Sequence, residues 1–395
     1  MNNVTRRAML ATTALLAAPA IVRGQGAPIK LGILQPVTGA LAQDGELGRL
    51  GAQLAIDEVN AAGGVPGLGM IEMVFGDARS TPDAGTAEVE RLNSEGVCAI
   101  VGGFASPICL AASQAASRYG LPYIVDVGVA ESIVTRGLTN TFRFAPGFST
   151  VTSVALDNLV TINDAAGKPA KTVVLVHEDG LFGSGLAKLM QTELPKRGFE
   201  VLDTIAHPTP ARDMSNVALR IRSLAPDLIV PSDYYAEFVL LARTLQQQRI
   251  KPKGIYGVLN GAASNYRFVN EFPTIAEGLL DCNHWADPKN PKTAALKAKV
   301  EGLGKVFSYN VMLNYSCVLL VADALARAKT ADRAALLAAI GSSTFAGHIM
   351  PYGPTQFVNG QNKGATPVNT QVQGGAIKVI FPNAVADAKP VFPVT

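Results

Sequence analysis

The sequence predicts an α/β fold made of two doubly wound lobes, each built around a parallel sheet. Short apolar runs bounded by turn residues alternate with longer segments that carry apolar residues at helical spacing, as in repeated βα units. One series of such units precedes Pro146 and a second series follows it. A chain of 395 residues is long enough for two or three domains, each with its own core.

The first series starts with an apolar run at 29–37, which predicts a strand buried on both faces. A helix is expected over 48–62, closed by Gly63 and Gly64. The elements expected next are a strand at 70–78, a helix at 82–93 with Thr81 as N-cap, a strand at 97–103, a helix at 108–119 and a strand at 122–128.

The second series starts with a helix from about residue 149. The elements expected after it are strands at 171–179, 199–207, 227–235, 253–259 and 277–285, and helices at 185–197 and 217–224. A long apolar helix over 309–329 has no strand of its own, and short antiparallel strands are expected in 347–379, where Gly, Pro and Asn recur. These remaining segments indicate that the chain crosses back between the lobes.

Residues 1–26 have the composition of a secretory signal. Arg6 and Arg7 precede an apolar stretch at 8–18, which is too short to span a bilayer, and small residues follow it. The paired arginines resemble a twin-arginine signal, although Met9 and Ala11 depart from that motif and leave the general export route open. The leader therefore predicts export to the periplasm and removal of the signal peptide. No other segment has 18 uninterrupted apolar residues, so we expect no membrane span.

The composition excludes several classes of protein. With 48% hydrophobic residues, 16% charged residues and a formal net charge of +3, the chain is neither disordered nor a basic nucleic-acid binder. The four cysteines and four histidines show no metal-binding spacing, so we expect free buried thiols, no metal and no cofactor. No G-x-G-x-x-G follows the first strand and no G-x-S-x-G is present, which argues against a dehydrogenase and a hydrolase.

Several segments in register resemble one known family. They include IKLGILQPVTGALAQDGELGRLGAQLAIDEVNAAGGVPG at the start, then AIVGGFAS, FRFAPG and VVLVHEDGLFGSG. From Pro28 onward the chain resembles the periplasmic solute-binding proteins of the Leu/Ile/Val type, which serve ABC transporters and have the type I periplasmic binding fold. The resemblance implies two lobes joined by a three-crossover hinge, with a ligand cleft between them.

The resemblance also implies domain boundaries and a function. With crossovers placed near 145–147, 281–285 and 344–352, the first lobe comprises 28–146 plus 285–345, and the second comprises 147–284 plus 346–395. We expect a monomeric, non-enzymatic binding protein that captures a small metabolite by hinge closure and delivers it to an ABC permease. The expected ligand is an amino acid or a related amide, carboxylate or aromatic acid. A ligand-sensing partner of a membrane receptor and, less favoured, an exported α/β enzyme are the alternatives.

Ligands of open α/β sheets bind beyond the carboxyl ends of the strands, so the candidate residues follow the strands. In the first lobe these are Phe104 and Ser106 after one strand, and Asp126, Gly128 and Val129 after the next. By resemblance, Ser106 offers its hydroxyl to a ligand carboxylate; its alternative role is to cap the following helix. Backbone N–H groups of Val129 and Glu131 are further candidate donors.

In the second lobe the resemblance assigns aromatic walls to Phe182, which could instead be a core residue, and to Tyr234 or Tyr235. The chain departs from amino-acid-binding relatives at Leu259, where those relatives carry Glu. A buried ammonium without a counter-charge is costly, so another acid must replace that Glu if the ligand carries an ammonium. The acids at strand-end loops are Asp44, Asp126, Asp179 and Asp233, with Asp233 favoured and Asp126 second.

Overall fold

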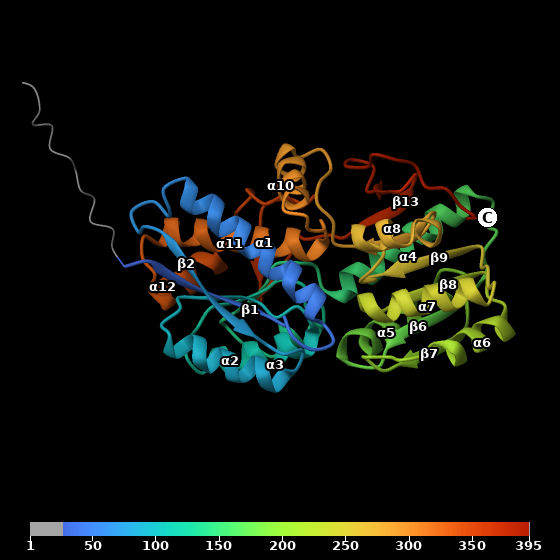
Figure 1. Cartoon of the computed structure of the whole chain (residues 1–395), viewed down its shortest axis with the longest axis horizontal. Coiled ribbons are helices and arrows are strands. Elements are labelled where there is room, and N and C mark those ends of the chain that lie inside the picture. Colours follow the sequence, from blue (N-terminus) through green and yellow to red (C-terminus); the bar gives the residue numbers. More distant parts are fainter. Residues whose placement is uncertain (1–26, 395) are drawn as a thin grey trace, which may run out of the picture.

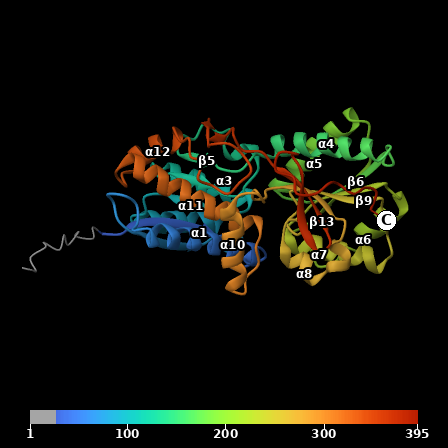
Figure 2. The same ribbon diagram turned by 90° about the horizontal axis from the view of Figure 1, so that it is seen from above.

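The computed structural model describes residues 27–394, so the expected signal peptide with Arg6 and Arg7 lies outside the described residues. The chain forms two lobes side by side, each a seven-stranded sheet covered by helices on both faces (Figures 1 and 2). The doubly wound α/β fold expected from the sequence is confirmed.

The first lobe has strand order β11-β12-β5-β4-β3-β1-β2. Its strands are β1 (Ile29–Gln35), β2 (Ile71–Asp77), β3 (Ile100–Gly102), β4 (Tyr123–Val125), β5 (Thr141–Arg143), β11 (Phe357–Val358) and β12 (Gln361–Asn362). All neighbours pair in parallel except β11 with β12. The carboxyl ends of the parallel strands therefore meet at one edge of this sheet.

The helices of the first lobe cover both faces of its sheet. They are α1 (Ala42–Ala61), α2 (Pro82–Ser94), α3 (Ser106–Ser117), α10 (Pro291–Gly302), α11 (Tyr309–Ala328) and α12 (Arg333–Gly341), with a 3₁₀ turn at Glu131–Ile133. Helices α2 and α3 lie on one face, and α1 and α11 pack together on the other (Figure 1). The expected cap of α2 is confirmed, because the Thr81 hydroxyl accepts a hydrogen bond from the Ala84 N–H.

The second lobe has strand order β14-β13-β10-β9-β8-β6-β7. Its strands are β6 (Thr172–Glu178), β7 (Glu200–His207), β8 (Leu228–Ser232), β9 (Gly254–Val258), β10 (Leu280–Asn283), β13 (Val368–Gln373) and β14 (Ala376–Phe381). The last two strands are antiparallel and the others are parallel.

Helices cover both faces of the second sheet (Figure 2). The helices of this lobe are α4 (Phe148–Ala165), α5 (Leu181–Lys196), α6 (Ser215–Leu224), α7 (Tyr235–Gln247), α8 (Tyr266–Glu271) and α9 (Pro273–Ala276). Helices α4 and α5 pack on one face, and α6 and α7 on the other.

The chain passes between the sheets three times. It leaves the first sheet after β5, returns after β10, and passes to the second sheet for the last time between β12 and β13. We expected the last passage at 344–352 and the whole of 346–395 in the second lobe, but β11 and β12 pair at the edge of the first sheet. Residue type explains the difference: Gly, Pro and Asn mark the turns of this segment but do not specify its partner strand.

Helices α1 and α5 begin earlier than expected, at Ala42 and Leu181. Glycines near each start weaken the helical pattern in the sequence, yet in the structure they let the helix backbone lie close to neighbouring segments of the chain. A Cβ on Gly51 would lie 2.2 Å from the carbonyl oxygen of Val311 in α11, and one on Gly183 would lie 2.4 Å from the carbonyl oxygen of Glu178.

Within residues 27–394, α11 is the one helix long and apolar enough to cross a membrane. Its residues are mostly buried against α1 and the first sheet, as in the core helix of a globular lobe. All four cysteines are buried, and none of them is paired in this described part of the chain.

Candidate functional site

A cavity that is partly open to solvent lies between the two lobes. Residues of both lobes and of the crossover after β10 line it: Phe104, Ala105, Ser106, Val127, Val129, Phe182, Asp233, Tyr234, Leu259, Gly261, Asn283, His284 and Tyr309. A mainly apolar lining with a few polar groups is typical of a site for a small organic ligand. Seven of the ten residues singled out from the sequence are brought together here: Phe104, Ser106, Val129, Phe182, Asp233, Tyr234 and Leu259.

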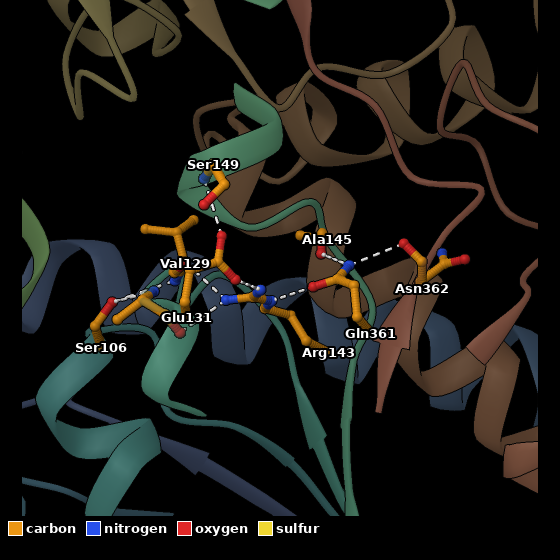
Figure 3. Close-up of polar contacts among 9 residues, drawn as sticks. Ser106, Val129, Glu131, Arg143, Ala145, Ser149, Gln361 and Asn362 are labelled. Carbon is orange, nitrogen blue, oxygen red and sulfur yellow. Dashed lines mark hydrogen bonds and ion pairs between the residues drawn. The ribbon is translucent and has the colours of Figure 1, made fainter. Parts of the chain in front are cut away.

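Ser106 is the first residue of α3, and its side chain does not cap that helix, contrary to the alternative considered from the sequence. Its Oγ instead accepts hydrogen bonds from the N–H groups of Val129 and Ala130, both at 3.2 Å (Figure 3). Because these two donors occupy the acceptor positions of the oxygen, the hydroxyl hydrogen is left to donate toward the cavity. The Val129 N–H, a candidate ligand donor, is therefore already used.

Two cavity residues have left-handed backbone conformations that non-glycine residues rarely adopt. Phe104, after β3, has φ of 54°, and Leu259, after β9, has φ of 56°. Such conformations are costly and tend to persist at functional sites. The Asp126 carboxylate supports one of them, because it accepts a hydrogen bond from the Phe104 N–H at 3.0 Å.

The second lobe contributes an aromatic wall and an acid. The Tyr234 ring lies 5.4 Å from that of Phe182 and, across the cleft, 5.8 Å from that of Phe104. Phe182 both lines the cavity and packs in the core of its lobe, a position that fits either of the roles considered from the sequence. Tyr235 lies outside the cavity, with Arg267 over its ring.

Asp233 is fully buried at the end of β8. Its Oδ1 pairs with Nε2 of His207 at 2.8 Å, whereas Oδ2 has no hydrogen-bond partner among residues 27–394. Burial raises the pKa of Asp233 and outweighs the opposing effect of His207. Burial alone would lower the pKa of His207, but the bond to Asp233 raises it. Asp233 thus lines the cavity and has one carboxyl oxygen that no residue in 27–394 satisfies.

Asp44, Asp126 and Gly128 lie outside the cavity lining. Asp44 is buried at the start of α1, where Asn310 donates to it at 2.9 Å, and burial raises its pKa to about 7. Asp126 accepts bonds from Gln35 and Asn314 besides Phe104. Gly128 lets its loop pack against Cys109, whose Sγ would lie 2.7 Å from an added Cβ. These residues support the loops around the cavity.

Sequence reasoning missed Asn283, His284 and Tyr309 as residues of the cavity. Asn283 and His284 lie near the end of the run EGLLDCNHW, which looked like an ordinary buried strand, and Tyr309 begins an apolar core helix. The available signal was position, because Asn283 and His284 fall inside the expected second crossover. Their side chains reach the cavity from the hinge.

A buried arginine forms hydrogen bonds to several segments at the hinge. Arg143 donates from Nη1 to the carbonyl oxygens of Val129 and Ala130 at 2.7 and 2.8 Å, from Nε to Gln361 at 2.6 Å, and from Nη2 to Glu131 at 2.7 Å (Figure 3). Glu131 in turn accepts the N–H of Ser149 at the start of α4 at 2.9 Å. Burial would raise the pKa of Glu131, but Arg143 and the Ser149 N–H hold it below its ordinary value.

Gln361 extends this network to the first crossover, because its amide donates to the Ala145 carbonyl oxygen at 3.1 Å. The side chains of Arg143, Glu131 and Gln361, which we call the hinge network, therefore join the Val129 loop, the first crossover and β12. The loop that holds Ser106 in place is thereby linked to the passage between the lobes.

No group of three or more His, Cys, Asp or Glu side chains is placed to hold a metal ion anywhere in residues 27–394. The cavity offers a hydroxyl group from one lobe, a carboxyl group from the other, and aromatic surface between them.

Comparison with known proteins places this geometry in a family. The sequence model of the family described as periplasmic binding protein matches residues 28–375. A Leu/Ile/Val-binding protein homolog 7 from Brucella melitensis is 30% identical over 389 residues, which cover 95% of this chain and 96% of that protein.

Solved structures agree in fold. A leucine binding protein from Thermotoga maritima superposes with a TM-score of 0.76 at 22% identity, covering 89% of this chain and 97% of that one. A solute binding protein of an ABC transporter from R. palustris, solved in complex with benzoate, gives 0.77 at 20% identity, covering 92% and 98%. The resemblance stated from the sequence is confirmed: the chain belongs to the periplasmic binding protein family, whose members bind solutes.

Proposed function

We propose that this protein captures a small carboxylate-bearing metabolite between its lobes and delivers it to an ABC permease. Amino acids are the first class to consider, followed by amides and aromatic acids. The observation that carries this proposal is that Ser106 of the first lobe and Asp233 of the second line one cavity. A ligand that uses both contacts must touch both lobes, and such contacts favour the closed arrangement.

The two polar contacts suit the two ends of an amino acid. The free hydroxyl hydrogen of Ser106, at the N-terminal end of α3, favours a carboxylate. The unpartnered Oδ2 of Asp233 favours an ammonium or another hydrogen-bond donor. Asp233 then takes the role of the Glu that amino-acid-binding relatives carry at the position of Leu259. Family membership supports binding rather than catalysis, and the name of the Brucella relative, a Leu/Ile/Val-binding protein homolog, supports an amino acid as the ligand.

The test begins with a thermal-shift screen of amino acids, carboxamides and aromatic acids. Saturation at 100 times Kd adds about 2.7 kcal/mol of stability, which such a screen detects readily. Titration calorimetry with the best compound then compares Ser106→Ala and Asp233→Asn with wild type. Each variant should lose about tenfold or more in affinity, since hydrogen bonds to charged groups contribute about 1.5–3 kcal/mol.

Matched controls separate site effects from general ones. Ser117→Ala changes a serine at the exposed end of α3, and Asp323→Asn changes an exposed aspartate of α11; both should bind within twofold of wild type. If Ser106→Ala and Asp233→Asn also bind within twofold, the proposed contacts are wrong. Binding by none of these compounds would reject the proposed ligand class.

We also propose that residues 1–26 direct export to the periplasm. Mass spectrometry of a periplasmic extract should find a mature chain that begins between Ala20 and Ala27. Replacing Arg6 and Arg7 by Lys should block export if the twin-arginine route is used. A chain that still begins at Met1 or Asn2 would contradict the proposal.

A further inference from the structure

His284 has an unusual environment among the histidines. It directly follows β10, where the chain leaves the second lobe, and it lines the cavity with only 2% of its surface exposed. Its backbone N–H donates to the Asn283 side chain at 2.7 Å. Within residues 27–394, however, neither nitrogen of its ring has a hydrogen-bond partner.

The other three histidines are each bonded through at least one ring nitrogen. His177 contacts the Glu178 carbonyl oxygen at 2.7 Å, His207 contacts Asp233, and His348 contacts the Gly353 carbonyl oxygen at 3.1 Å. Buried polar groups in native proteins nearly always have partners, because leaving them unpaired costs free energy. Since His284 borders the cavity, we expect a bound ligand to supply the missing hydrogen-bond partner of its ring.

The charge of His284 limits what that partner can be. Burial lowers the pKa of His284 to about 3, and the nearby Arg143 guanidinium acts in the same direction. The ring is therefore neutral at physiological pH, with one nitrogen donating and the other accepting. A neutral imidazole complements an uncharged group that both accepts and donates a hydrogen bond.

Beside the hydroxyls of Tyr234 and Tyr309, His284 is the polar side chain of the cavity lining that residues 27–394 leave free for this role. Ser106 and Asp233 account for a carboxylate and a donor group, while Phe104, Phe182 and Leu259 supply apolar surface. The Asn283 amide beside His284 already donates to the Asn260 carbonyl oxygen and to Asp281. His284 thus remains as a polar contact for another part of the ligand.

We propose that His284 is a specificity-determining contact, and that the ligand carries, besides its carboxylate, an uncharged group that donates and accepts a hydrogen bond. A carboxamide and a hydroxyl both meet this requirement, whereas the aliphatic side chains of Leu, Ile and Val do not. The inference rests on the proposed function and narrows its substrate class.

Pairs of ligands with similar shape but different polarity test this inference by titration calorimetry. The pairs are asparagine with leucine, glutamine with methionine, threonine with valine, and 4-hydroxybenzoate with 4-methylbenzoate. Wild type should bind the polar member at least tenfold more tightly in one or more pairs, because an apolar partner leaves the imidazole unpaired. The asparagine and glutamine pairs report a carboxamide, and the other two report a hydroxyl.

Variants then assign the preference to one side chain. His284→Phe should abolish the preference and bind the apolar member at least as tightly as wild type does. His284→Gln keeps a donor and an acceptor and should retain part of the preference. His348→Phe, which removes a buried histidine outside the cavity, should leave the ratio of affinities unchanged.

A measurement on the wild-type protein covers the case in which His284→Phe fails to fold. The imidazole ¹⁵N resonances of His284 should shift when the preferred polar ligand is added, and should shift much less with its apolar counterpart. Two outcomes would overturn this inference and leave the proposed function standing. They are binding of the apolar members as tightly as the polar ones, and a preference for the polar members that persists in His284→Phe. Binding of no carboxylate in any pair would overturn the proposed function as well.

Discussion

Asp233 and Ser106 are the two side chains that we propose as ligand contacts. Each has some of its hydrogen-bonding capacity filled by the protein, through His207 for Asp233 and through two backbone N–H groups for Ser106. What remains is one carboxyl oxygen and one hydroxyl hydrogen, each held in a fixed orientation. Such preorganisation lowers the entropic cost of binding.

A second buried acid gives the protein a measurable pH dependence. Asp281 in β10 accepts hydrogen bonds from Ser264 and Asn283, yet burial raises its pKa from 3.8 to about 7. The folded state therefore binds a proton more tightly than the unfolded state does. The associated stability is fully present below about pH 4 and is lost as the pH rises toward 7.

We predict that Asp281→Asn removes this pH-dependent part of the unfolding free energy. The difference in stability between wild type and variant should change by up to about 4 kcal/mol between pH 4 and pH 8, at 1.36 kcal/mol per pKa unit. Urea denaturation at several pH values measures it, with the exposed Asp323→Asn as a control for the method. Asp281→Asn also loses a hydrogen-bond acceptor, which lowers its stability at every pH. The comparison therefore uses only the slope of the unfolding free energy against pH. Parallel curves for wild type and Asp281→Asn would contradict the prediction.

Residue types predicted part of the site and missed the rest for identifiable reasons. Ser106, Phe182 and Asp233 follow strands of the predicted sheets, so their place at the cavity follows from topology. The residue type of His284 gave no such signal, because a histidine near the end of an apolar run is indistinguishable in sequence from a core residue; only its position in the expected second crossover pointed to the hinge. Its lack of hydrogen-bond partners is visible only in three dimensions.

At the scale of elements, glycines decide how closely helices pack. The helix expected over 48–62 already contained Gly48 and Gly51, whereas Gly45 lies in the first turns of α1 that the expectation left out; tertiary packing outweighs the low helix propensity of these glycines. At Gly48 an added Cβ would lie 2.8 Å from the Gln35 side chain, and at Gly51 it would lie 2.2 Å from the Val311 carbonyl oxygen. Helix propensity alone could not reveal this contact, since the partner α11 lies about 250 residues away along the chain.

We predict that Gly51→Ala destabilises the protein by about 1–3 kcal/mol, because the new methyl group meets backbone that cannot move aside cheaply. Gly302→Ala at the end of α10 is the matched control, since its added Cβ would meet nothing within 4 Å. That control should be neutral or stabilising by up to about 1 kcal/mol. Thermal unfolding of both variants checks the prediction, and equal melting temperatures would contradict it.

The edge strands show a different limit of sequence reasoning. Alternation and turn residues in the tail predicted short antiparallel strands, and β11 with β12 and β13 with β14 are such pairs. Their division between the two sheets depends on distant contacts, such as the bond from Asn362 to the Phe144 carbonyl oxygen. Local pattern specifies that a strand forms, whereas its partner is set by the rest of the fold.

At the scale of the whole molecule, the lobes are joined by three narrow passages and share one cavity, which is an arrangement suited to hinge motion. We predict that a saturating ligand lowers the radius of gyration measured by small-angle scattering. The reason is that contacts to both lobes stabilise the closed state over the open one. An unchanged radius would indicate a rigid scaffold.

The hinge network should control this closure without touching the ligand. Gly147 lies in the first crossover, and a Cβ added there would lie 2.1 Å from Nη2 of Arg143. The guanidinium would have to move, which would weaken its bonds to Glu131 and to the loop of Val129. That loop in turn orients the Ser106 hydroxyl, so the damage extends to the cavity.

We therefore predict that Gly147→Ala weakens ligand binding by about tenfold and reduces the ligand-induced change in radius of gyration, while both lobes stay folded by circular dichroism. Gly353→Ala is the control, because that glycine is exposed and an added Cβ meets nothing within 4 Å. Calorimetry and scattering on the same samples separate the loss of a ligand contact from the loss of hinge closure. The loss of a ligand contact weakens binding but leaves the radius of gyration of the ligand-bound protein unchanged. If Gly147→Ala binds and closes as wild type does, Arg143 stabilises the fold without governing the hinge.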